Sequence, residues 1–527
     1  MNWAFWRRGP AAYLRAVHYF GHAQPVNFWE AAVLSEAPAH LAQIRRDGFD
    51  AVILVVPWRG FQLTLSPATY DEQNLDRLRR LLAIVRDSGL KFIVRVSYPW
   101  NNNPDSEGSY DERILGLFTR FEVRKAWLAY LREIRKIAEA FDGFQFAFFS
   151  WEDLPSIREL MGHRSLEERR SLAQATGYRD YLAERYPLAE ISRLFGKPIT
   201  DLSEICIPLP DCEAYITYHA FVDQALESLL LHGRSAWPRL SMQLRIDFDR
   251  LDRDGEPVWI QHDMRVTDPG MRVTYFFPFM YAQCHGETLS AAEVLVNLER
   301  MLLRVTDDGR NTRHFLDQFV FHDESPQFHV WARVRESEMG EYLLGAARLL
   351  RRYSRGFALW NYFDYRVNHF YNAAFLRGLQ GWKADGTVAV APGGEPRFVS
   401  LAPGASITQR MQPDMVGYAS ARYDTMQFAA RAIAAGTGGQ LRLSADGVPE
   451  ATIEVPSGAS QLEATLPAER HRGGTLDVTL ENTGTSAIEI TDLCLWGIVY
   501  RSHVYDEHGR PGRYLEPVRA MLRSDAT

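Results

Sequence analysis

The sequence has few of the patterns that mark metal, redox, membrane or nucleotide-binding proteins. Its 527 residues include four cysteines, and no pair has the C-x-x-C spacing of a zinc knuckle or a dithiol redox motif. No run of about 18 apolar residues predicts a transmembrane helix, and no apolar signal region follows the first residues. Phosphate-binding glycine motifs are also missing. We therefore expect a protein that has no cofactor and is cytoplasmic, with a secreted protein whose signal segment has been removed as the alternative.

Positive charge is not in excess either. The formal net charge is -7, and lysine and arginine are spread thinly along the chain. This balance gives no reason to expect nucleic acid or an anionic membrane as a partner. Aromatic residues are plentiful, with 13 Trp and 23 Tyr, which suits a large core as well as the stacking of sugar rings. A homo-oligomer is compatible with this composition.

Eight short apolar runs are typical of buried strands, and longer helical patterns lie between them. The runs cover residues 16–20, 51–56, 91–96, 144–149, 240–246, 272–277, 318–321 and 356–361. The helical pattern is clearest at residues 75–88, where Leu75, Leu78 and Leu82 share one face and Gly89 follows as a C-cap. Eight strand–helix units predict an α/β fold of the (β/α)8, or TIM-barrel, type. A doubly wound sheet is the alternative.

The composition changes around Gly381, where glycine- and proline-rich turns begin to separate short alternating strands. We therefore predict a barrel over residues 1–375, with a helical insertion at 154–238. An all-β sandwich resembling a jelly roll is predicted over residues 376–500. The charged tail, residues 501–527, is expected to pack on the barrel or on the sandwich.

Two acidic clusters follow the fourth and seventh strand-like runs. One contains Glu152 and Asp153, and the other contains Asp323 and Glu324. Function in such barrels lies at the C-terminal ends of the strands, and a carboxylate there is costly without a task or a partner. Paired carboxyls are what glycosidic-bond cleavage requires. We predict that Glu152 and Glu324 are catalytic.

Other interpretations of these carboxylates remain open. Either glutamate could cap the next helix or pair with an arginine. Because side chains alternate along a strand, one carboxylate of each cluster should face the barrel mouth, and Asp153 and Asp323 compete for that position. Asp247 and Asp249, after the fifth run, are a weaker alternative.

Further candidates could contact a hydroxyl-rich ligand, since aromatic rings supply stacking area and polar groups supply hydrogen bonds. The substrate-binding candidates are Trp58, Arg95, Trp100, Asn101, Trp151, Tyr281, His322 and Trp360. Each of them is also compatible with a place in the core or in a loop. Arg95, Tyr281 and His322 are plausible hydrogen-bond donors that would keep a nucleophile ionised.

Metal catalysis has little support in the sequence. His18 and His22 lie near the first run, but a metal-dependent barrel hydrolase would need further histidines after the fifth and sixth runs. Asp247 and Pro278 stand there instead. We therefore expect no metal.

The barrel resembles retaining glycoside hydrolases with the acid/base after strand four and the nucleophile after strand seven. Within that clan it is similar to family 42 β-galactosidases, in residues 178–208, 319–325 and 343–363. The resemblance implies that Glu152 is the acid/base and Glu324 the nucleophile. It also implies that Tyr281 lies near the nucleophile and that Trp360 is a sugar platform.

One position departs from that clan. The residue before the acid/base is usually an asparagine that holds the sugar 2-hydroxyl, and here it is Trp151. The resemblance therefore implies a retaining hydrolase of an oligosaccharide or polysaccharide with altered substrate contacts. A non-catalytic carbohydrate-binding barrel and a metal-dependent hydrolase are the alternatives.

Overall fold

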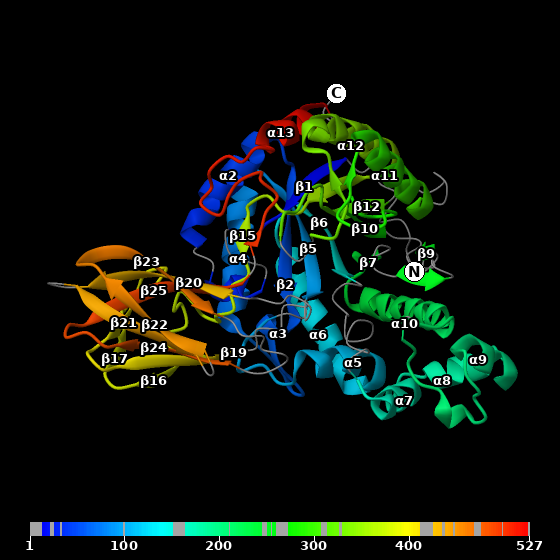
Figure 1. Ribbon diagram of the computed structural model, residues 1–527, viewed down its shortest axis with the longest axis horizontal. Helices are drawn as coiled ribbons and strands as arrows, with labels where there is room; N and C mark the ends of the chain where they lie inside the picture. Colours follow the sequence, from blue (N-terminus) through cyan, green and yellow to red (C-terminus); the bar gives the residue numbers. More distant parts are fainter. Residues whose placement is uncertain are drawn as a thin grey trace.

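The computed structural model of the chain contains a barrel with a smaller β domain beside it (Figure 1). The residues described are 13–21, 26–31, 34–98, 101–150, 164–209, 211–244, 250–253, 256–259, 272–306, 314–325, 329–411, 425–434, 438–445, 448–467, 476–497 and 499–524. Within these ranges, no helix is both long enough and apolar enough to cross a membrane.

Eight parallel strands close into the barrel, in the spatial order β1-β14-β12-β10-β7-β6-β5-β2. They are β1 (Leu14–His18), β2 (Ala51–Pro57), β5 (Lys91–Tyr98), β6 (Phe144–Ser150), β7 (Leu240–Leu244), β10 (Arg272–Phe276), β12 (His314–Phe319) and β14 (Gly356–Leu359). Strands buried on both sides read as continuous apolar runs, which is why the sequence revealed them. The predicted fold class is confirmed.

Helices separate most of the barrel strands. They are α2 (Ala37–Asp47), α4 (Glu72–Asp87), α6 (Phe121–Ala138), α10 (Ala214–Ala236), α11 (Ala291–Val305) and α12 (Met339–Tyr353). In α4, the Asp71 side chain accepts a hydrogen bond from the backbone N–H of Asn74 and starts the helix. Between β7 and β10, the described residues form the hairpin of β8 (Arg250–Arg253) and β9 (Glu256–Trp259).

Shorter elements decorate the barrel. They are α1 (Phe28–Ala31), η2 (Leu34–Glu36), α3 (Trp58–Phe61), β3 (Gln62–Leu65), β4 (Ala68–Tyr70), α5 (Tyr110–Thr119), β11 (Thr288–Leu289), β13 (Arg333–Val334) and η9 (Glu336–Glu338). Between β6 and β7, α10 is preceded by α7 (Leu166–Ala175), α8 (Tyr178–Ala183), α9 (Leu188–Phe195) and η6 (Leu202–Glu204). This region is helical, as its periodicity indicates.

The helix that follows β14 in the barrel comes from the end of the chain. Helix α13 (Leu515–Ser524) lies beside α12 and near α2 (Figure 1). Its apolar residues Leu515, Val518 and Leu522 belong to the barrel's main hydrophobic core. The Arg15 guanidinium, on β1, donates a hydrogen bond of 3.0 Å to the Leu522 carbonyl. The sandwich is thus inserted between the eighth strand and its helix.

The β domain consists of two five-stranded antiparallel sheets. One is ordered β16-β19-β24-β21-β22 and the other β17-β18-β25-β20-β23. Their bounds are β16 (Lys383–Asp385), β17 (Val388–Val390), β18 (Val399–Leu401), β19 (Ser406–Met411), β20 (Thr425–Ala434), β21 (Gly439–Ala445), β22 (Val448–Val455), β23 (Gly458–Pro467), β24 (Leu476–Asn482) and β25 (Ile488–Trp496). Alternating inward residues build a core separate from that of the barrel, as expected for a sandwich. Strands β15 (Tyr365–Arg366) and β26 (Val499–Tyr500) pair where the chain leaves and re-enters the barrel region.

Candidate active site

The barrel interior changes from apolar to polar toward the C-terminal ends of its strands. The apolar layer consists of Leu14, Ala16, Ala51, Ile53, Ile93, Phe146, Phe148, Phe315 and Ala358. Two residues further along their strands, His18, Arg95 and Asp317 continue the inward-facing side. His18 Nε2 donates to the Asp317 carbonyl oxygen at 2.6 Å, and Gln243 Nε2 contacts both Asp317 carboxylate oxygens, at 2.8 and 2.9 Å. A polar layer therefore lies beneath the barrel mouth.

At the ends of β2 and β5, the candidate ligand residues are enclosed by the fold. Trp58 is 1% exposed, and its indole N–H donates to Gln62 Oε1 at 2.7 Å. Asn101 is fully buried, and its amide donates to Glu30 Oε2 at 3.3 Å. Arg95 is also buried, with its guanidinium 5.2 Å from the centre of the Tyr98 ring. Partners within the protein account for all three side chains.

Several candidates from the sequence lie outside the described residues. They are His22, Trp100, Trp151, Glu152, Asp153, Asp247 and Asp249. The described part of β6 ends at the buried Ser150, two residues before Glu152.

Glu324 lies after β12 in a charged cluster that two distant parts of the chain build together. Its backbone N–H donates to the Arg501 carbonyl at 3.3 Å. Oε2 accepts a hydrogen bond of 2.7 Å from His503 Nε2, and Oε1 is paired with the Arg513 guanidinium. His322 Nε2 lies 3.3 Å from Oε1. About a third of the Glu324 side chain is exposed, so the carboxylate remains accessible from solvent.

The cluster controls the charge of Glu324. Partial burial raises the pKa of this carboxyl, but the hydrogen bond from His503 and the positive charges of His503, His322 and Arg513 outweigh it and lower the pKa to about 2. Burial lowers the pKa of His322 to about 4, despite the opposing effect of Glu324. Because His322 is neutral above that pH, Arg513 is the permanent cation beside Glu324. The carboxylate is therefore ionised at neutral pH.

Two buried carboxyls underlie this cluster. Asp364 accepts backbone N–H bonds from Ser502 at 2.8 Å and His503 at 3.1 Å, which anchors the returning chain beside Glu324. Asp323 accepts hydrogen bonds from the backbone and hydroxyl of Ser325. Burial raises the pKa of Asp323 to about 7, and the charge of Asp364 adds to that effect. Asp323 is thus a poorer candidate than Glu324 for a permanently ionised group.

The same cluster has donors of the kind that hold a metal ion. One ligand atom each from His322, Glu324 and His503 lie within 4.8 Å of one another. Two histidines and a carboxylate are suitable ligands for zinc or iron. The Arg513 guanidinium bound to Glu324 opposes a second cation at this position.

Trp360 and Tyr281 are the remaining described candidates, and each contacts another ring or a guanidinium group. Trp360 follows β14, is partly exposed, and packs edge-on against His18 with 4.8 Å between ring centres. Tyr281 lies after β10, where the Arg300 guanidinium of α11 is 4.5 Å from the centre of its ring. His322 and Glu324, by contrast, form a direct polar contact with each other.

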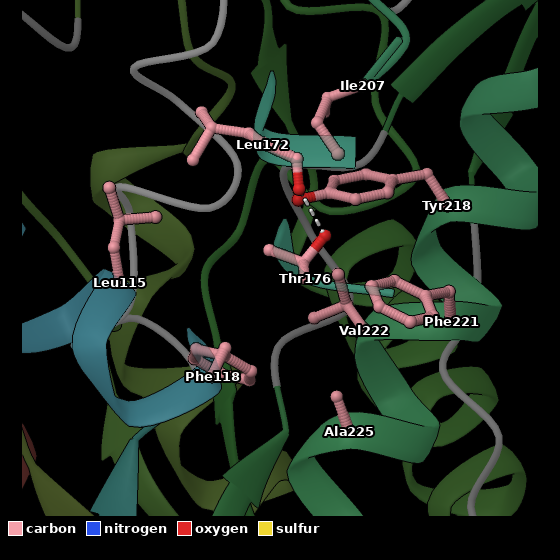
Figure 2. A pocket seen from close by; sticks show the side chains of 9 residues that line it. All are labelled: Leu115, Phe118, Leu172, Thr176, Ile207, Tyr218, Phe221, Val222 and Ala225. Carbon is pink, nitrogen blue, oxygen red and sulfur yellow. Dashed lines mark hydrogen bonds between the residues drawn. The ribbon is translucent and has the colours of Figure 1, made fainter. Parts of the chain in front are cut away.

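The hollow beside the helical insertion is too small for a substrate. Leu115, Phe118, Leu172, Thr176, Ile207, Tyr218, Phe221, Val222 and Ala225 line it (Figure 2). Its volume is about 10 Å³, no more than one water molecule would fill. The hollow is a packing gap between α5, α7 and α10.

Sequence reasoning did not identify His503, Arg513 or Asp317 as site residues. Asp317 could have been found, because a charged residue beside a strand-like run is a functional signal. His503 and Arg513 are 179 and 189 residues from Glu324, and nothing near them in the chain indicates that contact.

Comparisons with known proteins gave matches among solved structures, and none among family models or curated proteins. Among solved structures, the chain is similar to the exo-β-1,4-mannosidase Op5Man5 from Opitutaceae bacterium strain TAV5, with 14% identity, a TM-score of 0.42, and coverage of 67% of this chain and 52% of the mannosidase. It therefore spans about half the length of that enzyme.

Two further solved structures are similar over the same share of the chain. A GH5_18 protein from Streptomyces cattleya in complex with GlcNAc has 13% identity and a TM-score of 0.42, with 67% of this chain and 72% of that chain covered. A β-galactosidase from the psychrophilic Marinomonas ef1 has 11% identity and a TM-score of 0.44, with 66% and 54% covered. These three structures bear the names of a mannosidase, a GH5_18 protein and a β-galactosidase. The narrower likeness to family 42 stays a prediction.

Proposed function

We propose that the protein is a retaining glycoside hydrolase that cleaves an oligosaccharide or polysaccharide, with Glu324 as nucleophile and Glu152 as acid/base. The observation that carries this proposal is the state of Glu324. It is a partly exposed carboxylate that follows a barrel strand and is held ionised by Arg513 and His503. A nucleophile in this reaction must be ionised and accessible, and Glu324 is both.

In the proposed reaction, a Glu324 carboxylate oxygen bonds to the anomeric carbon as the glycosidic bond breaks. The leaving oxygen takes its proton from Glu152. In the second step Glu152 removes a proton from water, the water oxygen bonds to the anomeric carbon, and the Glu324 ester bond breaks. The anomeric configuration is retained because each displacement inverts it.

The C-terminal segment supplies the positioning residues. His503 holds one Glu324 oxygen by a hydrogen bond, and Arg513 is paired with the other. Charge-assisted contacts of this kind fix both the orientation and the ionisation of a carboxylate. On the substrate side, Trp360 is the platform, and we assign further sugar contacts to Trp100 and Trp151. Trp151 stands where a 2-hydroxyl-binding asparagine would, so recognition at that hydroxyl must differ.

The test is a panel of aryl glycosides and polysaccharides assayed with the wild type and the Glu324→Gln and Glu152→Gln variants. Glu324→Gln keeps the size of the side chain and should lower turnover at least ~10³-fold, with an unchanged circular dichroism spectrum. The Glu152→Gln variant should lose far less turnover on substrates whose leaving group needs no proton. Unchanged turnover in Glu324→Gln would contradict the assignment.

A metal-dependent hydrolase is the second candidate, and the His322, Glu324 and His503 donors favour it. Glu324→Gln would inactivate either enzyme, so metal content must separate them. Stoichiometric zinc in the purified protein, together with activity that a chelator removes and zinc restores, would support the metal-dependent reaction. Full activity in a metal-free sample would support the glycosidase. Sugar binding without turnover would instead indicate a non-catalytic barrel.

A further inference from the structure

A second candidate site lies between the barrel and the sandwich, away from Glu324. The cleft has a volume of about 460 Å³. The barrel contributes residues of η2 and α4, and the segment between β17 and β18 contributes most of the other wall. The lining residues are Ser35, Gln73, Arg80, Leu376, Gly394, Glu395 and Arg397. Leu376 is the one large apolar side chain among them, so the cleft is polar.

Positive charge exceeds negative charge in this cleft. Arg77 and Arg80, one turn apart on α4, both contact the same Glu395 oxygen, at 3.2 and 3.3 Å. Arg77 also interacts with Glu30. Among the residues that line the cleft, the two guanidinium groups of Arg80 and Arg397 accompany one carboxylate, that of Glu395. The nearby Glu36 lies next to Ser35, but its carboxylate interacts with Arg431 and Asp492.

Arg397 has no partner within the described part of the chain. Its backbone N–H donates to the Ala374 carbonyl at 3.0 Å, but its guanidinium forms no hydrogen bond or ion pair there. The Nε atom is buried and unsatisfied. Leaving a buried donor without an acceptor has an unfavourable free energy. A ligand that brings an acceptor to Arg397 would recover this cost.

We propose that the cleft binds the acidic sugar unit of a saccharide, with its carboxylate held by Arg397 and Arg80. Guanidinium groups bind carboxylates in a planar, two-bond arrangement. Ser35 and Gln73 add polar groups for the hydroxyls of the ring, and the volume lies within the usual range for small-molecule sites. This site is separate from the proposed catalytic centre, because none of its lining residues belongs to the Glu324 cluster.

The proposal can be tested by binding alone, with no need for activity. Isothermal titration at low ionic strength would compare glucuronate, glucose and inorganic phosphate on the full-length protein. The same titrations would use Arg397→Gln, Arg80→Gln and the control Arg79→Gln. Arg79 is next to Arg80 on α4 and carries the same charge, but it does not line the cleft. Because the Arg397 guanidinium has no partner among the described residues, its replacement should leave the fold intact.

We expect glucuronate to bind at least ~10-fold more tightly than glucose. Arg397→Gln and Arg80→Gln should each weaken it about 10-fold, whereas Arg79→Gln should bind as the wild type does. The proposal is overturned if glucuronate does not bind, or if Arg397→Gln binds it as well as Arg79→Gln does. Phosphate binding more tightly than glucuronate would also overturn it, because the cleft would then be a general anion site. Glu324→Gln should bind glucuronate normally, so failure of the proposed hydrolase activity would be a distinct result.

Discussion

Two regions occupy equivalent places around the barrel: the ends of β2 and β5, and the segment after β12. Their side chains differ in burial and in the source of their partners. Trp58 and Asn101 are almost fully buried, and each has a hydrogen-bond partner in the fold. Glu324 is a third exposed, and its partners come from the C-terminal segment. The residue type alone is therefore not sufficient to identify a side chain that can bind a ligand. At the ends of β2 and β5, neighbouring segments bury the side chains. After β12, the neighbouring segment contacts Glu324 but leaves part of it exposed to solvent.

The largest expected effect tests whether the β2 end is structural. Trp58→Ala should lower the free energy of unfolding by about 3–5 kcal/mol, because it removes a fully buried indole and its hydrogen bond to Gln62. Urea denaturation measures this change. A loss near zero would mean that Trp58 is not part of the core, and the contrast between the two regions would disappear.

The next effect concerns the charge of Glu324. Arg513→Met removes the permanent cation and should raise the pKa of Glu324 from about 2 toward its ordinary value. Since the proposed nucleophile must be ionised, the acid limb of kcat/KM should move to higher pH, whereas activity at neutral pH should change little because Glu324 is still ionised there. Arg513→Lys keeps a positive charge at this position and should show a smaller shift than Arg513→Met. A uniform loss at every pH would indicate a merely structural role for Arg513.

A smaller effect is expected at the partly exposed Trp360. Trp360→Ala should raise KM about 5–10-fold and lower the free energy of unfolding by less than Trp58→Ala does. Steady-state kinetics and urea denaturation on the same samples give both values. An unchanged KM, with a stability loss equal to that of Trp58→Ala, would place Trp360 among the core residues instead.

The smallest effect is on the pH dependence of stability. The pKa of Asp323 is raised to about 7 by burial, so the folded state binds its proton more tightly than the unfolded state does. The contribution of Asp323 to the free energy of unfolding is fully present below about pH 4 and is lost as the pH rises through 7. Asp323→Asn keeps an acceptor for Ser325 and should raise Tm by about 2–5 °C at pH 8, with little change at pH 4. An equal shift at both pH values would contradict this.

The sequence predicted the strands best where both faces of a strand are buried. The continuous apolar runs of β2 and β5 predicted these strands almost to the residue, because both faces of a barrel strand are dry. Strand β12 was placed four residues too late, since it contains the buried polar residues His314 and Asp317. A hydropathy pattern does not predict a strand that contains buried polar residues. In the structure, the Asp317 carboxylate accepts a hydrogen bond from the Gln243 amide.

Contacts between distant segments could not be read from the sequence. Helix α13 has a clear apolar face in Leu515, Val518 and Leu522, but nothing local indicates that it follows β14 in the barrel after an inserted sandwich. The partners of Glu324 depend on the same return of the chain. Trp58 and Trp360 likewise each follow a barrel strand directly, but Trp58 is buried and Trp360 is partly exposed.

The most direct measurement is to trap the proposed covalent intermediate. A 2-deoxy-2-fluoro glycoside with a good leaving group, matched to the best substrate of the panel, should inactivate the enzyme by slowing release of the glycosyl group. Mass spectrometry of the digested protein is then expected to find one sugar bound to the peptide that contains Glu324, with none on the Glu324→Gln variant. A sugar bound to another carboxylate, or steady turnover without labelling and with inversion of configuration, would contradict the account.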